Sequence, residues 1–271
     1  MIIKIVEDGK KGDLFYIRLN NGRIFYSDLL RSRFEREMYT YYSTSVYEID
    51  KEVPDIYQKH FRGSMGSIDK LTNLKVSEEK RKFMFQNLPI RKGDVVLELG
   101  SYYGFSALRL SELVGEKGLV ITVEASKKNF QILEKNINVN KVNNIIPINK
   151  GIWSSKGKLT LYDAGNKRKS LIKGFVKSSS KEKVDVDTID NILEETHIKN
   201  IDVVASDLNG SEYKALKGMP KLLSQSKLRL FINGFTTNGC LKIKKFLEKR
   251  GYEVYIGVAF RVYAFKLGHK D

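Results

Sequence analysis

Three carboxylates of this chain could take part in chemistry, because each stands at the end of a short apolar run. They are Glu98, Glu124 and Asp207. Short apolar runs predict buried strands, and ligands of open α/β sheets bind beyond the carboxyl ends of such strands. The sequence therefore predicts that these carboxylates lie along one edge of a sheet, where they can accept hydrogen bonds or a proton.

The turn after the first of these strands, Glu98 to Gly104 (ELGSYYG), indicates which ligand the site could take. A dinucleotide-binding turn needs a glycine where this chain has Tyr102, because its backbone must approach a pyrophosphate closely. A nicotinamide or flavin cofactor is therefore disfavoured. S-adenosylmethionine has no phosphate, and Glu124 stands where a carboxylate can accept both hydroxyls of a ribose. In the alternative interpretation, Gly104 only permits close helix packing and Glu124 supports the helix that begins at Ser126.

An alternation of strand and helix patterns must position these residues. It begins after Arg91–Asp94, where we expect a domain boundary, gives way to short strands over 152–188, and resumes at residue 201. The expected strands are 95–99, 119–124, 144–149, 158–163, 183–189, 201–206, 228–233, 252–257 and 259–267. The expected helices are 104–114, 127–140, 211–223 and 238–250. This alternation predicts an open parallel sheet with helices on both faces, and the tight connection between the last two strands makes them antiparallel.

The first 90 residues predict a small α+β extension. Its expected elements are strands 15–19 and 23–27, helices 28–43 and 77–88, and a loop at 60–67. The two strands are joined through Asn20-Asn21-Gly22, a turn sequence that tolerates positive φ. We expect residues 1–90 to form part of the wall of an acceptor site, and residues 91–271 to form the domain that binds S-adenosylmethionine.

Composition disfavours several classes of protein. Cys240 is the only cysteine and the three histidines are scattered singly, so the chain offers neither an internal disulfide nor zinc-ligand spacing. No apolar stretch approaches the ~20 residues of a membrane span, and we expect a cytoplasmic protein. The formal charge of +16 includes two basic stretches, 156–183 and 241–250, which are either solvated faces or a surface for an anionic ligand.

Two later stretches complete a family pattern. Val186-Asp187-Thr188-Ile189-Asp190 is similar to a V-x-T-L-D signature, and 207–218 (DLNGSEYKALKG) is similar to D-x-E-G-x-E-x-x-x-L-x-G. Together with the turn at 98–104 and the segment 124–140, they make residues 91–235 resemble the FkbM-type methyltransferases. The resemblance implies an α/β, Rossmann-like class I methyltransferase fold with a mostly parallel sheet and a C-terminal antiparallel strand. It also implies S-adenosylmethionine as the cofactor.

The resemblance further implies a role for each matching residue. The implied cofactor-binding residues are Glu98, Gly100, Ser101, Tyr102, Gly104, Glu124, Ala125, Asn149, Trp153 and Asp207. Among them, Asn149 and Trp153 lie where adenine contacts usually occur, although a tryptophan more often fills the core. Asp207 would orient or deprotonate the acceptor, with Glu212 as the second candidate, and either could instead support the following helix. Asp207 and Asn233 are a weak signal for Mg²⁺, so no metal is predicted.

This chain departs from the family pattern at three positions. Ala205 stands where the family usually has lysine, and Asn209 and Asn233 stand where it has glutamate. Amides position a substrate through hydrogen bonds but cannot take a proton. Either Asp207 or Glu212 is the base alone, or the acceptor differs from the family norm, or catalysis has been lost.

Three functions follow from these patterns. The first, implied by the resemblance, is O-methylation of a hydroxyl on a sugar or another small molecule. The second is methylation of an RNA ribose 2′-hydroxyl by way of the basic surface, which a steep salt dependence of RNA binding would support. The third is a non-catalytic binding module that keeps the fold, suggested by Asn209 and Asn233. The sequence carries no signal of the oligomeric state.

Overall fold

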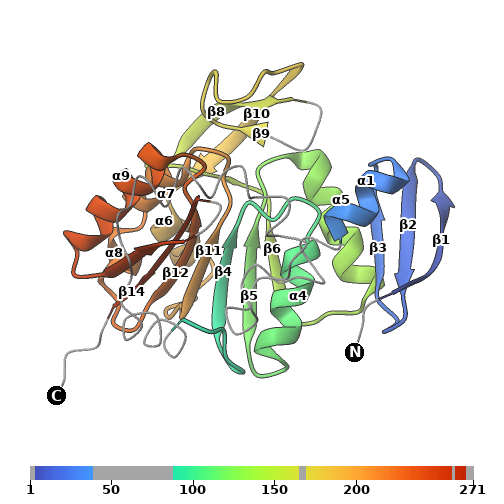
Figure 1. Cartoon of the computed structure of the whole chain (residues 1–271), viewed down its shortest axis with the longest axis horizontal. Helices are drawn as coiled ribbons and strands as arrows, with labels where there is room; N and C mark the ends of the chain where they lie inside the picture. The colour runs from blue at the N-terminus through green and yellow to red at the C-terminus, as the bar shows by residue number, and fades with distance from the viewer. Residues whose placement is uncertain (1–3, 39–87, 165–168, 258–259, 267–271) are drawn as a thin grey trace.

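A central sheet runs through the molecule in the strand order β13-β14-β12-β11-β4-β5-β6 (Figure 1). The computed structural model describes residues 4–38, 88–164, 169–257 and 260–266. The strands of this sheet are β4 (Val95–Leu99), β5 (Leu119–Val123), β6 (Ile145–Ile148), β11 (Val203–Ser206), β12 (Arg229–Asn233), β13 (Glu253–Ile256) and β14 (Arg261–Phe265). β14 is antiparallel to β12 and β13, whereas β4, β5, β6, β11 and β12 pair in parallel. The expected Rossmann-like sheet with an antiparallel C-terminal strand is confirmed.

The chain changes its direction of travel across this sheet at β4. From β4 it passes outward to β5 and β6, and it then returns to place β11 on the other side of β4. Because the connections leave β4 and β11 in opposite directions, a crevice is expected where these two strands end. The fold therefore directs a ligand to the carboxyl ends of β4 and β11.

Helices cover both faces of the central sheet, because side chains along each strand alternate between two buried clusters. Leu97 and Leu99 of β4 belong to one cluster, together with side chains of α6 (Ile189–Glu195), α7 (Glu212–Lys217), α8 (Pro220–Ser224) and α9 (Thr237–Glu248). Val96 belongs to the other cluster, together with side chains of α4 (Phe105–Val114) and α5 (Lys127–Val139). The expected coverage of both faces is thus present.

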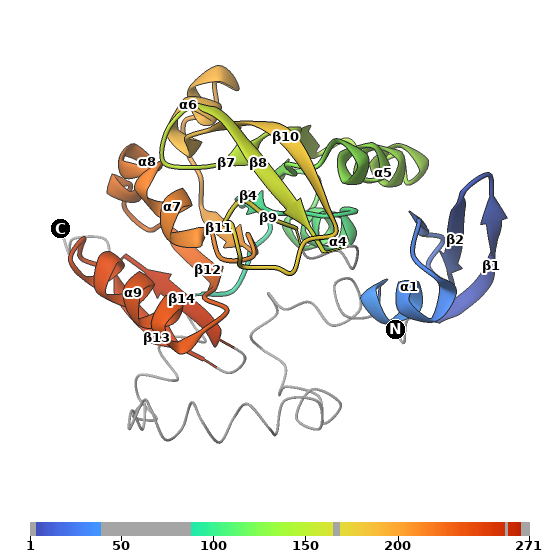
Figure 2. The same cartoon turned by 90° about the horizontal axis from the view of Figure 1, so that it is seen from above.

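A smaller sheet lies above the central sheet in Figure 1, in the order β7-β10-β8-β9. Its strands are β7 (Gly151–Ile152), β8 (Gly157–Asp163), β9 (Lys169–Ser170) and β10 (Ser180–Asp187). Seen from above in Figure 2, β8 and β9 cross over the position of β4 and β11. Leu161, Val184 and Val186 form a small buried cluster in this sheet. The sheet therefore covers the edge to which the fold directs a ligand.

The N-terminal elements pack onto the face that carries α4 and α5. They are β1 (Ile5–Lys11), β2 (Leu14–Leu19), β3 (Ile24–Ser27) and α1 (Arg31–Met38), and the strands form an antiparallel sheet in the order β1-β2-β3. Phe25 of β3 and Phe34 of α1 contact Phe105 of α4, with ring centroids 5.4 and 5.7 Å apart. All three rings are buried in one cluster with Val96 of the central sheet. Residues 4–38 therefore share a hydrophobic core with the central sheet.

Asn136 of α5 and Asn140, which follows the last residue of α5, bind the edge of β3 that faces them. The side-chain oxygen of Asn136 accepts from the Tyr26 N–H (2.6 Å), and its NH₂ donates to the carbonyls of Tyr26 (3.1 Å) and Tyr103 (2.8 Å). Asn140 accepts from the Ile24 N–H (2.9 Å) and donates to the Ile24 carbonyl (2.6 Å). Helix residues four apart are spaced by about 6 Å, close to the span of two strand residues, so the two amides match alternate residues of β3.

Removal of either amide should destabilise the protein, by different amounts. Asn136→Ala leaves three backbone groups without their partner in a fully buried contact, and we expect the free energy of unfolding to fall by about 2–4 kcal/mol. Asn140→Ala acts at a half-buried contact and should cost only about 1–2 kcal/mol. Urea unfolding of both variants measures the difference. Equal losses would contradict this account of the contact.

The strand expected over 183–189 is wrong at its end. β10 stops at Asp187, and α6 begins at Ile189. Thr188 is the N-cap of this helix, because its hydroxyl oxygen accepts a hydrogen bond from the Asn191 N–H (3.2 Å). A threonine that caps a helix adopts an extended backbone, which explains why it reads as the last part of a strand.

The helix expected over 211–223 is interrupted. Pro220 occupies the first turn of α8, and α7 already ends at Lys217, because proline has no N–H to donate to a preceding turn.

The helix expected over 77–88 and the loop over 60–67 fall outside the described residues, apart from Leu88. Within the part of the chain that the structure describes, no helix is long and apolar enough to cross a membrane.

Candidate functional site

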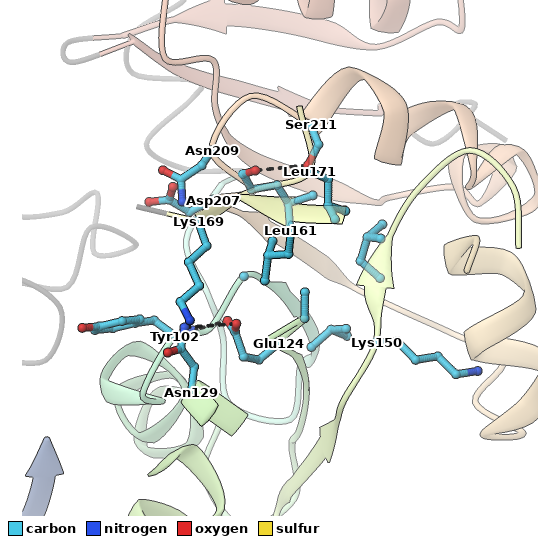
Figure 3. A pocket seen from close by; sticks show the side chains of 15 residues that line it. Tyr102, Glu124, Asn129, Lys150, Leu161, Lys169, Leu171, Asp207, Asn209 and Ser211 are labelled. Atoms are coloured by element: carbon cyan, nitrogen blue, oxygen red, sulfur yellow. Dashed lines mark hydrogen bonds between the residues drawn. The ribbon is translucent and has the colours of Figure 1, made fainter. Parts of the chain in front are cut away.

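A pocket lies at the carboxyl ends of β4, β5 and β11, beneath β8 and β9 (Figure 3). Its apolar side chains are Val123, Ala125, Ile152, Leu161, Leu171 and Leu208. Gly100, Tyr102, Glu124, Asn129, Lys150, Lys169, Asp207, Asn209 and Ser211 complete the lining. The pocket thus combines apolar contact with acids and bases, as small-molecule sites do.

The turn between β4 and α4 fits tightly against the end of β11. Gly100 has φ +86°, and a Cβ atom there would lie 2.2 Å from the carbonyl oxygen of Asp207. The Asp207 N–H in turn donates to the carbonyl of Leu99 (2.9 Å). A side chain at position 100 would therefore separate the two strand ends. Glycine is required here both by the backbone conformation and by the close approach.

Glu124 is held by the turn and by the start of α5. Its carboxylate accepts from the backbone N–H of Tyr102 (2.9 Å), the N–H of Ser126 (2.9 Å) and the side-chain NH₂ of Asn129 (3.2 Å). Burial raises the pKa of Glu124 to about 7, although these hydrogen bonds oppose the shift. Since the Tyr102 N–H already donates to Glu124, it is not available to a pyrophosphate.

Glu98 lies beneath the turn and does not line the pocket. Its carboxylate accepts hydrogen bonds from the hydroxyls of Thr122 (2.6 Å) and Ser106, and only 2% of the residue is exposed. Burial raises the pKa of this carboxyl group. Glu98 therefore ties β4 to β5 and to α4, which supports the turn from below.

The loop after β11 carries Asp207 into the pocket. Among the described residues, the Asp207 carboxylate forms no hydrogen bond or ion pair. Glu212 is 3% exposed and accepts from the backbone N–H groups of Leu208 (2.8 Å) and Gly210 (3.3 Å). Burial raises the pKa of Glu212 to about 8. Glu212 thus fixes the loop, while Asp207 faces the space of the pocket.

The pocket brings together five of the predicted cofactor-binding residues. They are Gly100, Tyr102, Glu124, Ala125 and Asp207. Glu98, Ser101, Gly104, Asn149, Trp153 and Glu212 do not line it. Asn149 donates to the carbonyl of Glu124 (2.8 Å), whereas Trp153 packs against the cluster around Leu161 and lies under Lys214. Asn149 and Trp153 thus contact residues of the pocket from outside it.

Several lining residues are not among the predicted site residues. Ile152, Leu161 and Lys169 belong to strands of the smaller sheet, Lys150 directly precedes β7, and Leu171 directly follows β9. Lys169 belongs to the basic stretch 156–183, whose sequence pattern predicts a solvated face or a surface for an anionic ligand and not part of a pocket. The amino-acid pattern does not show that this stretch folds into a second sheet, which lies over the end of the central sheet and brings Lys169 to the pocket.

The residues present fit S-adenosylmethionine better than a dinucleotide. The pocket offers a buried carboxylate at Glu124, apolar side chains around Ala125 and Ile152, and a glycine cradle at Gly100. Tyr102 stands at the position where a pyrophosphate needs glycine. Within the described residues, no group of three or more His, Cys, Asp and Glu could hold a metal ion.

A family model described as the methyltransferase FkbM domain matches residues 98–254, which is more than half of the 271 residues. The chain belongs to the FkbM methyltransferase family. This family depends on S-adenosylmethionine, the cofactor that the residues of the pocket fit.

The relatives of this FkbM chain match it over short segments. A protein-L-isoaspartate O-methyltransferase of Thermotoga maritima is 44% identical over 55 residues, which cover 20% of this chain and 17% of that protein. Its counterpart in Fervidobacterium nodosum is 40% identical over 62 residues, which cover 23% of this chain and 31% of that protein. The matches thus span less than a third of either relative. The crystal structure of methyltransferase FkbM from Methylobacillus flagellatus KT has a TM-score of 0.49 and 18% identity, covering 68% of this chain and 46% of that one.

The segment 186–190, which is similar to the V-x-T-L-D signature, has a structural role here. Asp187 accepts from the Thr188 N–H (2.8 Å) and from the side chain of Asn191 (2.9 Å). Asp190 accepts from the backbone N–H groups of Lys221 (2.8 Å) and Leu222 (3.0 Å) at the start of α8. The signature thus caps two helices that cover one face of the central sheet.

Proposed function

We propose that this chain transfers a methyl group from S-adenosylmethionine to a hydroxyl of a sugar or another small molecule. The observation that carries the proposal is the meeting of Gly100, Glu124 and Asp207 in one pocket of an FkbM domain. These residues follow three different strands whose carboxyl ends meet at one edge of the sheet, which supports Gly100 as a cradle, Glu124 as an acceptor of hydrogen bonds and Asp207 as a base in this proposal.

Different parts of the pocket suit different parts of the cofactor. Glu124 offers its carboxylate to ribose hydroxyls, and Ala125 and Ile152 offer apolar contact to adenine. Gly100 permits close backbone contact with the methionine portion. When bound, S-adenosylmethionine supplies a methyl group on a positively charged sulfur, which an acceptor oxygen can displace in line.

Asp207 is the base of this proposal. Its carboxylate lies in the pocket without a partner among the described residues, so it can accept the proton of an acceptor hydroxyl as the O–CH₃ bond forms. Glu212 fixes the loop that carries Asp207 through the N–H groups of Leu208 and Gly210. Asn209 lines the pocket beside it, and its amide can orient the acceptor but cannot take the proton.

Calorimetry and a transfer assay test the proposal in two steps. The first step measures binding of S-adenosylhomocysteine to the full chain, and an absence of heat would remove the proposed cofactor. The second step offers labelled S-adenosylmethionine together with a panel of glycosides and small alcohols. Label on an acceptor oxygen supports the proposal, whereas binding without transfer to any acceptor would favour a non-catalytic module.

Cofactor affinity should depend on pH through Glu124. Its pKa is raised to about 7, so the carboxyl group is protonated below that pH and loses capacity to accept from the ribose. If binding needs the carboxylate, the dissociation constant of S-adenosylhomocysteine rises about tenfold from pH ~8 to pH ~6. The ligand-free protein responds in the opposite sense, because a raised acid pKa makes the folded state more stable as pH falls through 7.

Glu124→Gln is the control for this profile. Glutamine keeps the size and one acceptor oxygen, but it does not titrate, so the profile should become flat, at about the weak affinity that the wild type has at pH ~6. Calorimetry at several pH values measures both variants. A profile with the same slope in Glu124→Gln would assign the titration to another group.

The basic stretch that suggested RNA has acidic partners in the folded chain. Lys169 pairs with Asp163 (3.0 Å), and Lys158 pairs with Asp185 (2.9 Å). The Lys156 ammonium lies 3.6 Å from Glu195. Of these pairs, only that of Lys169 is largely shielded from solvent, since Lys158 and Lys156 are 74% and 69% exposed. We favour the small-molecule acceptor because the candidate residues line a pocket and not the exposed basic surface.

A further inference from the structure

Lys169 of β9 brings a largely buried positive charge into the pocket. Its ammonium donates to the hydroxyl of Ser126 (2.8 Å) and pairs with Asp163 (3.0 Å), and its side chain is 13% exposed. Figure 3 shows this side chain extending from β9 across the pocket toward Glu124. The charge is therefore built into the site, in contrast to the solvated lysines that a basic stretch usually contains.

Ser126 connects Lys169 to Glu124. The hydroxyl of Ser126 accepts from Lys169, while its backbone N–H donates to the Glu124 carboxylate (2.9 Å). Ser126 is fully buried, and Glu124 is 7% exposed, so water screens the two charges weakly. The positive charge of Lys169 lowers the pKa of Glu124, opposing the larger effect of burial that raises it to about 7.

Among the described residues, no charged group that lines the pocket forms a hydrogen bond or ion pair with Glu124 directly. Lys150 also lines it, but its ammonium binds Glu195 (2.5 Å) and lies 3.5 Å from Asp187. Asp207 follows β11, and Asp163 of β8 is the counter-ion of Lys169. The groups that reach Glu124 from the turn and from α5 are neutral donors. Lys169 is thus the cation that shares a hydrogen-bonded neighbour with Glu124.

We propose that Lys169 is a positioning residue of the cofactor site, which keeps Glu124 as a carboxylate so that it accepts ribose hydroxyls near neutral pH. The inference rests on the proposed function, because it takes S-adenosylmethionine or its demethylated product as the occupant. It assigns to the cofactor pocket a lysine that lies outside every motif by which the sequence resembles its family. An arginine can serve the same purpose, since only a positive charge near Ser126 is needed.

The test measures the pH dependence of S-adenosylhomocysteine binding by calorimetry, from about pH 5.5 to about pH 9. Lys169→Met removes the charge and the hydrogen bond, whereas Lys169→Gln removes the charge and keeps a donor for Ser126. Both should move the midpoint of the profile to higher pH by about one unit and weaken binding at pH 7 several-fold. Lys169→Arg should restore the midpoint of the wild type.

Lys150→Met is the matched control. It removes a lysine that also lines the pocket, but the Lys150 side chain extends away from Glu124 in Figure 3 and its ammonium binds Glu195. Its midpoint should equal that of the wild type. Thermal unfolding of each variant, followed by circular dichroism, identifies any variant that does not fold, and the glutamine and arginine variants then decide the question.

The outcomes separate the inference from the proposed function. An absence of binding to the wild type at every pH removes the proposed function. A wild-type profile that is flat, or a midpoint unchanged in Lys169→Met, overturns the inference while cofactor binding stands. A shift in Lys169→Met but not in Lys169→Gln would assign the effect to the hydrogen bond and overturn it as well. Tighter binding by Lys169→Met at all pH values would mean that Lys169 only fills the pocket, which also overturns it.

Discussion

Asp207→Asn is expected to lower the rate of methyl transfer by about 10²–10⁴-fold, the usual contribution of a general base. Asparagine has nearly the same size and can still accept a hydrogen bond, but it cannot take the proton of the acceptor hydroxyl. Asp207 forms no side-chain hydrogen bond among the described residues, so the loop should keep its conformation. The affinity for S-adenosylhomocysteine should therefore change little. Steady-state transfer rates and calorimetry measure the two quantities.

Glu212→Gln separates the two carboxylates that could act as the base. The side-chain oxygen of glutamine can accept the N–H groups of Leu208 and Gly210, as Glu212 does. Burial raises the pKa of Glu212 to about 8, so near neutral pH the wild-type side chain is mostly uncharged, as glutamine is. The rate should fall by less than about tenfold. A larger loss here than in Asp207→Asn would make Glu212 the base.

Gly100→Ala is expected to impair both stability and catalysis. Its Cβ would lie 2.2 Å from the Asp207 carbonyl, and the backbone at φ +86° is unfavourable for any L-residue with a side chain. Strain and overpacking together should lower the free energy of unfolding by about 2–5 kcal/mol. Because relief of the overlap moves Asp207 away from β4, the transfer rate should also fall by about 10²-fold in the protein that remains folded.

Gly104→Ala is the matched control for this prediction. Its backbone has a similar positive φ of +79°, but the added Cβ meets the end of the Leu133 side chain at 2.3 Å, which can rotate away. We expect a loss of about 1–2 kcal/mol and nearly normal cofactor affinity. Urea unfolding and calorimetry compare the two variants. Equal effects on catalysis would show that contact with Asp207 is not the reason for glycine at position 100.

The central strands could be predicted because each is a short apolar run between turns. β4 has its expected bounds, and β5 and β12 differ from theirs by one residue at one end. The two-residue strands β7 and β9 could not be predicted in this way, because each is too short for an apolar run and is defined by hydrogen bonds to another strand, β10 for β7 and β8 for β9. The pattern of apolar residues predicts strands that bury several of their own side chains. It does not predict two-residue strands, which form only because a partner strand pairs with them.

The sequence predicts two acidic residues that line the candidate site, but not the residues that the smaller sheet contributes to its lining. Glu124 and Asp207 follow strands whose ends meet by topology, so the order of elements suffices to bring them together. Glu98 illustrates the limit, since its place within β4 directs it to the side of Thr122 and Ser106. Lys169 illustrates another limit of prediction. A basic stretch contains many lysines, and the sequence does not indicate which of them becomes buried in a pocket.

The contacts of Asn136 and Asn140 with β3 have a consequence for association between molecules. An uncovered strand edge can add a strand from another chain, and β3 would be such an edge in the sheet of residues 4–27. Asn136 and Asn140 occupy the backbone groups of Tyr26 and Ile24 that a foreign strand would need. The opposite edge, β1, carries charged side chains and an irregular register near Ile5. Both borders of the small sheet thus discourage edge-to-edge aggregation.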